Sequence, residues 1–192
     1  MKSMKKLNPH FFLAVPISGE IRQYLHDWTQ EVQNHYPFKQ WVHLEDYHIT
    51  LSFLGKASLE QIEGIKKEVE KTAANHQSFS LTIDELNIFG REQSPRIFWV
   101  GVVESKPLRS LQKDVKNVCE REGFLLEKRP YKPHITLAKK WVADKVFPYA
   151  DVKKRIAKND ELTWDVKEIV LYETHLDRIP KYEAVKSFTL KD

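Results

Sequence analysis

The sequence predicts an α+β fold: a two-lobed, duplicated body in which antiparallel sheets carry helices on their outer faces. Strand-like and helix-like stretches interleave along all 192 residues. A unit of one strand, one helix and a pair of strands occurs about twice, and each half contains one copy of His-Ile-Thr-Leu, at 48–51 and 134–137. We therefore expect residues 1–192 to form a single domain, with both copies in a central cleft between its pseudo-symmetric lobes.

In the first half of the chain, Ser18 and Ser58 each mark the start of a helix. Serine accepts hydrogen bonds from the free backbone amides of a helix's first turn, and Ser58 forms a capping-box pattern with Gln61. Strands are expected at 10–15, 40–44 and 47–54, and Gly55 is expected to end the third. Apolar residues spaced by three and four predict the inward helix faces: Ile21, Tyr24, Leu25 and Trp28, then Leu59, Ile62, Ile65 and Val69.

The second half of the chain begins with a predicted β-hairpin, whose strands at 79–89 and 96–103 flank a polar loop with Gly90 and Pro95. Ser105 and Pro107 predict the start of a helix that Gly123 ends. The inward face of this helix is expected to consist of Leu108, Leu111, Val115 and Val118. The remaining expected elements are strands at 134–138, 162–174 and 182–190, and a partly helical stretch at 146–158.

Composition indicates a cytoplasmic protein. No run of apolar residues approaches the 18 or so that a membrane helix needs, and the N-terminus lacks the apolar stretch of a signal peptide. The single cysteine, Cys119, excludes an internal disulfide and lies in an apolar helical pattern, so we interpret it as a small core residue. No exposed apolar stripe is evident, so we expect a monomer. The net charge of +4 is compatible with an anionic substrate but does not require one.

The two His-Ile-Thr-Leu copies carry the chemistry if they lie in strands. Side chains of a strand alternate between its faces, so His48 and Thr50 share one face, while Ile49 and Leu51 can be buried behind them. The same alternation places His134 and Thr136 side by side. Two identical polar pairs, one from each half of the chain, could converge across a cleft.

Opening a 2',3'-cyclic phosphate needs a base to deprotonate water and an acid to protonate the departing ribose oxygen. Imidazole can take either role near neutral pH, because its unperturbed pKa is about 6.5. Threonine hydroxyls can donate to the non-bridging phosphate oxygens, where negative charge gathers in the transition state. In a strand the two side chains are about 6.5–7 Å apart, which suits a histidine on a reacting oxygen and a threonine on the phosphate. Such a site needs neither metal nor cofactor.

Several longer segments surround these motifs. They are residues 11–16 (FFLAVP), 47–55 (YHITLSFLG), 98–101 (FWVG), 129–138 (RPYKPHITLA) and 169–174 (IVLYET). With these segments in this order, the chain resembles the 2H phosphoesterase superfamily over nearly its whole length. Within that superfamily it is similar to the bacterial RNA 2',3'-cyclic phosphodiesterases, also known as 2'-5' RNA ligases.

The resemblance implies hydrolysis of 2',3'-cyclic phosphate ends of RNA to 2'-phosphomonoesters. By analogy with the family, His48 is the proton donor to the leaving 3'-oxygen and His134 is the proton acceptor that activates water. Residue spacing by itself does not decide between these two roles. Thr50 and Thr136 complete the catalytic set that the resemblance implies.

Other types of site are less well supported. A zinc centre needs three or four ligands, and motifs such as H-E-x-x-H are absent. No G-x-S-x-G motif of a serine hydrolase is present. No P-loop is present either, so any ligation would run as the reversal of phosphodiester hydrolysis rather than with ATP. A purely structural role of His48 and His134, as two buried and hydrogen-bonded histidines, remains open beside the catalytic one.

The substrate-binding residues are expected close to the second motif. Arg129 and Tyr131 precede it and are the strongest candidates for contacting the phosphate and a base. Other basic and aromatic residues of a possible RNA groove are Lys128, Lys132, Lys139, Lys140 and Trp141. Trp41 and Trp99 are interpreted as core residues, and at most one of Phe98 and Trp99 can face the cleft.

Two further functions remain open. The same mechanism could act on a small cyclic nucleotide or an ADP-ribose cyclic phosphate. Alternatively, the protein could be a non-catalytic module that binds RNA ends, whose affinity for RNA would survive the loss of both imidazoles.

Overall fold

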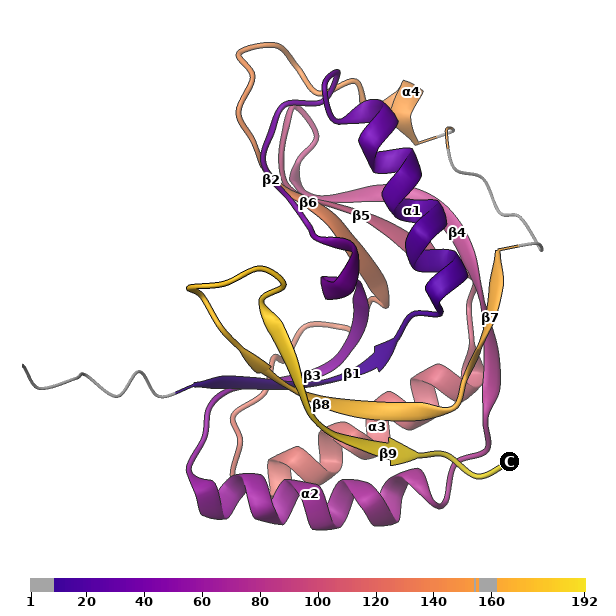
Figure 1. Ribbon diagram of the computed structural model, residues 1–192, viewed down its shortest axis with the longest axis vertical. Helices are drawn as coiled ribbons and strands as arrows, with labels where there is room; N and C mark the ends of the chain where they lie inside the picture. Colours follow the sequence, from indigo (N-terminus) through magenta and orange to yellow (C-terminus); the bar gives the residue numbers. More distant parts are fainter. Residues whose placement is uncertain (1–8, 154, 156–161) are drawn as a thin grey trace, which may run out of the picture.

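The computed structural model describes residues 9–153, 155 and 162–192 (Figure 1). Its named strands pair antiparallel in the order β7-β4-β5-β6-β3-β1-β8-β9, with β2 added on β6. The strands are β1 (His10–Pro16), β2 (Phe38–Trp41), β3 (His48–Lys56), β4 (Phe79–Arg91), β5 (Ser94–Val102), β6 (His134–Trp141), β7 (Thr163–Val166), β8 (Glu168–Thr174) and β9 (Tyr182–Thr189). The helices are α1 (Gly19–Val32), α2 (Leu59–Ala73), α3 (Lys106–Arg121), α4 (Tyr149–Val152) and the 3-10 helix η1 (Leu44–Asp46). The α+β prediction is confirmed.

The sheet consists of two parts that meet between β3 and β6. The pairing of these two strands consists of Ile49 opposite Ile135, whereas β1 and β3, or β5 and β6, pair over most of their length. Figure 1 shows β2, β4, β5 and β6 on one side of this junction and β1, β3, β8 and β9 on the other. The two copies of His-Ile-Thr-Leu therefore lie next to each other, running in opposite directions.

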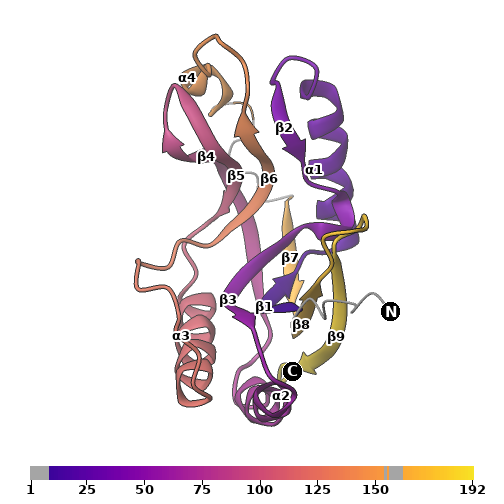
Figure 2. The same cartoon turned by 90° about the vertical axis from the view of Figure 1, so that its left-hand side faces the viewer.

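Each part of the sheet is covered by a helix that follows a strand of the other part. Helix α1 follows β1, but its Trp28 packs on Phe98 of β5, with 6.1 Å between the ring centroids. Helix α3 follows β5, but packs on β3 and on α2 (Figures 1 and 2). This exchange explains why the β3–β6 junction needs little strand pairing of its own, since the crossing chain segments also tie the two parts together.

The capping signals of the sequence operate as predicted. The Ser18 hydroxyl accepts a hydrogen bond from the backbone N–H of Ile21, and Ser58 and Gln61 form the complete capping box. Ser105 caps α3, and Gly123, with φ +85, lies just beyond its end in the left-handed region that favours glycine. Among the predicted inward residues, Ile21, Leu25, Ile62, Ile65, Val69, Leu108, Leu111, Val115 and Val118 are buried.

The structure corrects the predicted role of two apolar residues. The Leu59 side chain is 87% exposed, because it occupies the first position after the cap and the buried face of α2 starts only at Ile62. Tyr24 of α1 is also exposed, at 40%. Cys119, by contrast, is fully buried, and burial raises the pKa of its thiol to about 12, which confirms it as a core residue.

Some strand limits also differ from the prediction. Gly55 does not end β3 but lies within it at φ +66, next to a register shift against β1, so its flexibility is used in a bulge. Gly90 and Pro95 lie in β4 and β5 rather than in the loop between them. The predicted strand at 162–174 is divided into β7, which pairs with β4, and β8, which pairs with β1.

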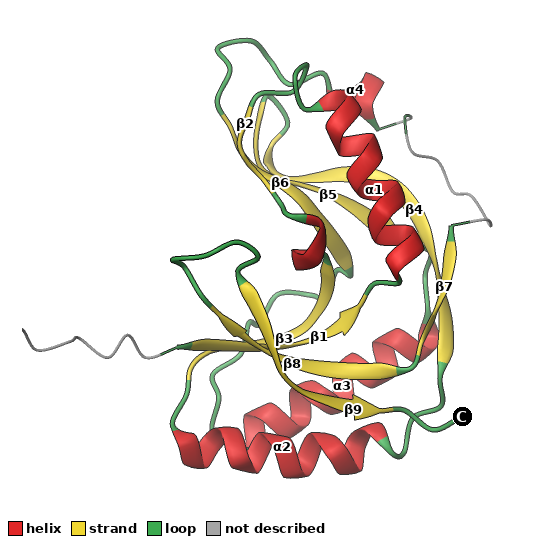
Figure 3. Cartoon of the chain, viewed as in Figure 1, coloured by secondary structure: helices red, strands yellow, loops and turns green. Residues whose placement is uncertain are grey.

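The remaining differences concern two short stretches (Figure 3). In the predicted strand at 40–44, β2 ends at Trp41 and Leu44 begins η1. In the stretch at 146–158, the helix covers Tyr149–Val152, and residues 154 and 156–158 lie outside the described part of the chain. In the chain as described, no helix combines the length and hydrophobicity that crossing a membrane requires.

Candidate active site

The alternation predicted for the two motifs occurs in β3 and β6. Ile49, Leu51, Ile135 and Leu137 are buried in the core. On the opposite face of the strands, His48, Thr50 and Thr136 line one cavity of about 300 Å³. The structure thus brings a polar pair from the first motif together with the threonine of the second.

The His48 ring is held from both ends. Its Nδ1 is 2.8 Å from the backbone carbonyl oxygen of Asp46, and its Nε2 is 3.0 Å from Oγ1 of Thr50. A carbonyl oxygen only accepts hydrogen bonds, so Nδ1 must carry the proton. In the neutral imidazole, Nε2 then has a lone pair and accepts the hydrogen bond that Thr50 donates.

His134 repeats this arrangement. Its Nδ1 donates to the backbone carbonyl oxygen of Lys132 at 2.7 Å, again two residues earlier in the chain. The ring contacts Phe89 and Trp99, with centroid distances of 4.9 and 5.5 Å. His134 is not among the residues that line the cavity, but it lies close enough for its charge to lower the pKa of His48.

In the absence of an anion, burial favours the neutral form of both imidazoles. Burial, opposed by the hydrogen bond to Asp46, lowers the pKa of His48 to about 4, and the charges of His134 and Lys139 contribute to this. Burial is also the main reason why the pKa of His134 lies below its ordinary value; the hydrogen bond to the Lys132 carbonyl opposes this shift, and the charge of the Lys132 side chain adds to it. A bound phosphate anion would favour the protonated form of either ring, so the substrate itself can prepare one of them to act as an acid.

The walls of the cavity around His48 are aromatic. Phe12 of β1 lies 4.7 Å from the His48 ring, and Tyr182 of β9 meets it edge-on at 5.2 Å. These rings account for the desolvation of the imidazole and restrict its orientation. Neither residue was predicted to be part of the site, because both come from strands distant in the chain.

Asp46 is a third residue that was not predicted to be part of the site. Its carboxylate is buried and accepts hydrogen bonds from the backbone N–H groups of Lys181, at 3.0 Å, and Tyr182, at 3.1 Å. Its carbonyl oxygen orients His48 at the same time. Asp46 therefore fastens the β8–β9 connection to η1 and positions both the imidazole and the ring of Tyr182. Its place two residues before His48 was the one available signal.

Lys139 supplies positive charge to the cavity. Its side chain is half-buried and lines the cavity together with Thr136, which belongs to the same strand, β6. Burial and the neighbouring charge of Lys181 lower the pKa of Lys139, whereas Asp46 raises it. An ammonium group in this position can attract a phosphate and stabilise negative charge on its oxygens.

The two predicted substrate-binding residues are not among those that line this cavity. The Arg129 side chain is 75% exposed and donates to Glu127 at 2.7 Å. The Tyr131 hydroxyl is buried and has no hydrogen-bond partner among the described residues, and burial raises its pKa. Neither residue lines the cavity, so their contact with substrate stays a prediction.

The other aromatic candidates separate into core and site. Trp141 is buried against Phe38 and Phe147, so it is a core residue rather than part of a groove. Phe98 is also buried in the core. Trp99 is buried as predicted, but its ring contacts His134, which agrees with the expectation that at most one of this pair faces the site. The described residues include no group of three or more His, Cys, Asp or Glu side chains placed to hold a metal ion.

Comparison with known proteins gives the family. Residues 16–178 match the model of the 2'-5' RNA ligase superfamily. A Geobacillus stearothermophilus protein named RNA 2',3'-cyclic phosphodiesterase is 39% identical over 181 residues, which cover 94% of this chain and 57% of that protein. A Bacillus subtilis protein of the same name is 34% identical over 189 residues, which cover 97% of this chain and 100% of that protein.

Solved structures agree in fold. E. coli LigT in complex with 3'-AMP superimposes with a TM-score of 0.80 at 24% identity, covering 96% of this chain and 99% of LigT. TT0787 of Thermus thermophilus gives a TM-score of 0.78 at 23% identity, covering 95% of this chain and 98% of that one. The resemblance seen in the motifs is thereby confirmed, and the chain belongs to the 2'-5' RNA ligase superfamily.

Proposed function

We propose that this chain is an RNA 2',3'-cyclic phosphodiesterase that opens cyclic phosphate ends to 2'-phosphomonoesters. The observation that carries the proposal is that the two motif histidines make the same hydrogen bond and so have the same tautomer. Each is tied through Nδ1 to the carbonyl two residues earlier, which leaves Nε2 as the proton-transfer atom on both rings. Relatives that bear the name RNA 2',3'-cyclic phosphodiesterase support the substrate class.

The reaction needs one proton removed and one delivered. Nε2 of His134 takes a proton from water as the water oxygen bonds to phosphorus. The bond between phosphorus and the 3'-oxygen breaks, and His48, protonated on Nε2 in the complex, gives its proton to that oxygen. The products are a 2'-phosphate and a free 3'-hydroxyl. The assignment of donor and acceptor rests on the family resemblance.

Thr50, Thr136 and Lys139 surround the phosphate in this proposal. All three line the cavity with His48. Their hydroxyl and ammonium groups can donate to the non-bridging oxygens as charge develops. A 5'-hydroxyl in place of water would form a 2'-5' linkage by the same steps, which accounts for ligation without a nucleotide triphosphate.

We also infer that the protein works in the cytoplasm, in keeping with its free Cys119 thiol. We further infer that it is a monomer.

The test is hydrolysis of a short RNA with a 2',3'-cyclic end in EDTA, with the product identified as a 2'- or 3'-phosphate. We expect a 2'-phosphate, and loss of about 10²–10⁴ in rate for His48→Ala and for His134→Ala. His35→Ala, at an exposed site just beyond the end of α1, is the matched control. If the folded wild-type protein instead binds RNA without turnover, and the affinity survives the loss of both imidazoles, the protein is a binding module.

A further inference from the structure

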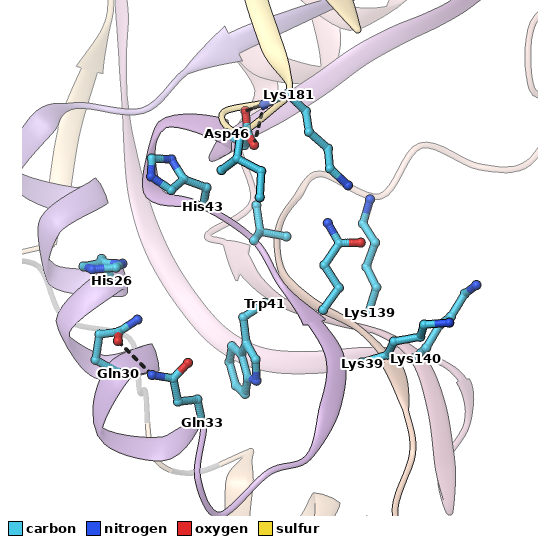
Figure 4. Close-up of a pocket in the computed structure, with 13 residues that line it drawn as sticks. His26, Gln30, Gln33, Lys39, Trp41, His43, Asp46, Lys139, Lys140 and Lys181 are labelled. Carbon is cyan, nitrogen blue, oxygen red and sulfur yellow. Dashed lines mark hydrogen bonds between the residues drawn. The ribbon is translucent and has the colours of Figure 1, made fainter. Parts of the chain in front are cut away.

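A second, larger cavity adjoins the first. It has a volume of about 600 Å³ and is bounded by α1, β2, β6 and the connection between β8 and β9 (Figure 4). Val42, Asp46 and Lys139 line both cavities, so the two are continuous along one wall. Volumes of about 300–1,000 Å³ are typical of ligand sites, so this space is large enough for a ligand of its own.

The larger cavity is strongly basic. Its lysines are Lys39, Lys139, Lys140 and Lys181. Within the described part of the chain, none of the four forms an ion pair. The charge of Lys181 lowers the pKa of Lys139, and Figure 4 shows these two side chains extending toward each other. This repulsion between cations, which Asp46 offsets in part, favours the binding of an anion.

The acidic group of this cavity is already engaged. Among the described residues that line this cavity, Asp46 is the one that carries a carboxylate. Its oxygens accept hydrogen bonds from the backbone N–H groups of Lys181 and Tyr182. Figure 4 shows Asp46 at the backbone of Lys181, whereas Lys39 and Lys140 lie together on another side of the cavity. The protein therefore leaves most of this positive charge for a ligand to neutralise.

Trp41 adds an aromatic wall. Its ring stands at 85° to Phe38 and 90° to Phe98, with centroid distances of 5.7 and 6.3 Å. These edge contacts with the core hold the indole in place while the residue lines the cavity. Trp41 was expected to be a core residue, and the structure shows it partly buried at the boundary between core and cavity. Aromatic rings in this position stack on nucleic-acid bases.

From these features we propose that the larger cavity binds the nucleotide on the 5' side of the cyclic end, with its phosphate among the lysines and its base against Trp41. This inference rests on the proposed function. A cyclic phosphate occupies the 2'- and 3'-oxygens of the last nucleotide, so the RNA continues from the site only in the 5' direction. The shared wall at Val42, Asp46 and Lys139 gives that continuation a direct path.

The test compares a 2',3'-cyclic mononucleotide with the dinucleotide that carries one more nucleotide on its 5' side. For the wild type we expect kcat/KM to be about tenfold or more higher for the dinucleotide, as stacking of one base implies. Trp41→Ala and the double variant Lys39→Ala/Lys140→Ala should reduce this advantage and leave the mononucleotide rate unchanged. Trp41→Phe should retain much of it, and Lys113→Ala, on the exposed face of α3, should retain all of it.

Binding of the 2'-phosphorylated products, measured by calorimetry, separates this inference from the proposed function because it needs no turnover. Tighter binding of the dinucleotide product, weakened in the Trp41→Ala and double-lysine variants, supports the subsite even if hydrolysis fails. Equal binding of the mono- and dinucleotide products by the wild type would overturn it. Equal losses for both lengths in the variants would overturn it as well, with thermal unfolding used to verify that each variant is folded.

Discussion

Ile49 of β3 and Ile135 of β6 face each other as the register pair that joins the two parts of the sheet. Each is the second residue of a His-Ile-Thr-Leu copy, so an approximate two-fold relationship between the motifs passes through this pair. Both side chains are fully buried. The histidine and threonine beside each isoleucine are therefore presented on the other face, where the site forms.

Replacing Asp46 should lower the stability of the protein. Its carboxylate accepts backbone N–H groups of Lys181 and Tyr182 while its carbonyl orients His48. Hydrogen bonds to a charged acceptor contribute about 1.5–3 kcal/mol each, so Asp46→Ala should lower the free energy of unfolding by several kcal/mol. Asp46→Asn keeps one acceptor oxygen and should lose less. Urea unfolding measures the stability of both variants. Equal stability of Asp46→Ala and wild type would contradict a stabilising role of the Asp46 carboxylate.

Removing the hydroxyl of Thr136 should lower the rate without unfolding the protein. Thr136 lines the cavity beside His48 and Thr50. Loss of one donor to developing negative charge typically reduces kcat by about 10²–10³, and Thr136→Val conserves the shape of the side chain. Thr136→Ser restores the hydroxyl and should recover most of the activity. Steady-state kinetics test this, and full activity of Thr136→Val would remove Thr136 from the catalytic set.

Stability should fall in acid because of His48. Its pKa is about 4 in the folded protein and about 6.5 when unfolded. Between these values the unfolded state binds more protons, so the free energy of unfolding decreases as pH falls from about 6.5 to about 4. His134, whose pKa is also lowered, adds to the same trend. Urea unfolding across this range gives the free energy of unfolding at each pH. This free energy should change less steeply with pH for His48→Gln than for wild type, and an identical dependence on pH would contradict the burial of the imidazole.

Local signals in the sequence were sufficient for most elements and for the two motifs. Ser58 with Gln61, and Ser105 with Gly123, mark helix ends through contacts within a few residues. The faces of β3 and β6 follow from alternation alone. The bulge at Gly55 was missed because it depends on the register against β1, which local patterning does not contain.

The parts of the site that depend on distant contacts could not be predicted. Asp46 acts on Lys181 across more than a hundred residues of chain, and Phe12 and Tyr182 reach His48 from other strands. Arg129 was selected for its nearness to His134 in sequence; its exposed side chain pairs with Glu127, and its contact with substrate stays a prediction. Sequence proximity does not fix the direction of an exposed side chain.

The measurement that tests the central claim most directly uses an RNA end whose 3'-oxygen is replaced by sulfur. A thiolate is a better leaving group than an alkoxide, with a thiol pKa of about 8.5, so it departs without an acid. If His48 is the proton donor and His134 the acceptor, His48→Ala should regain much of its lost rate on this substrate and His134→Ala should not. Rescue of His134→Ala instead, or of neither variant, would contradict the assignment.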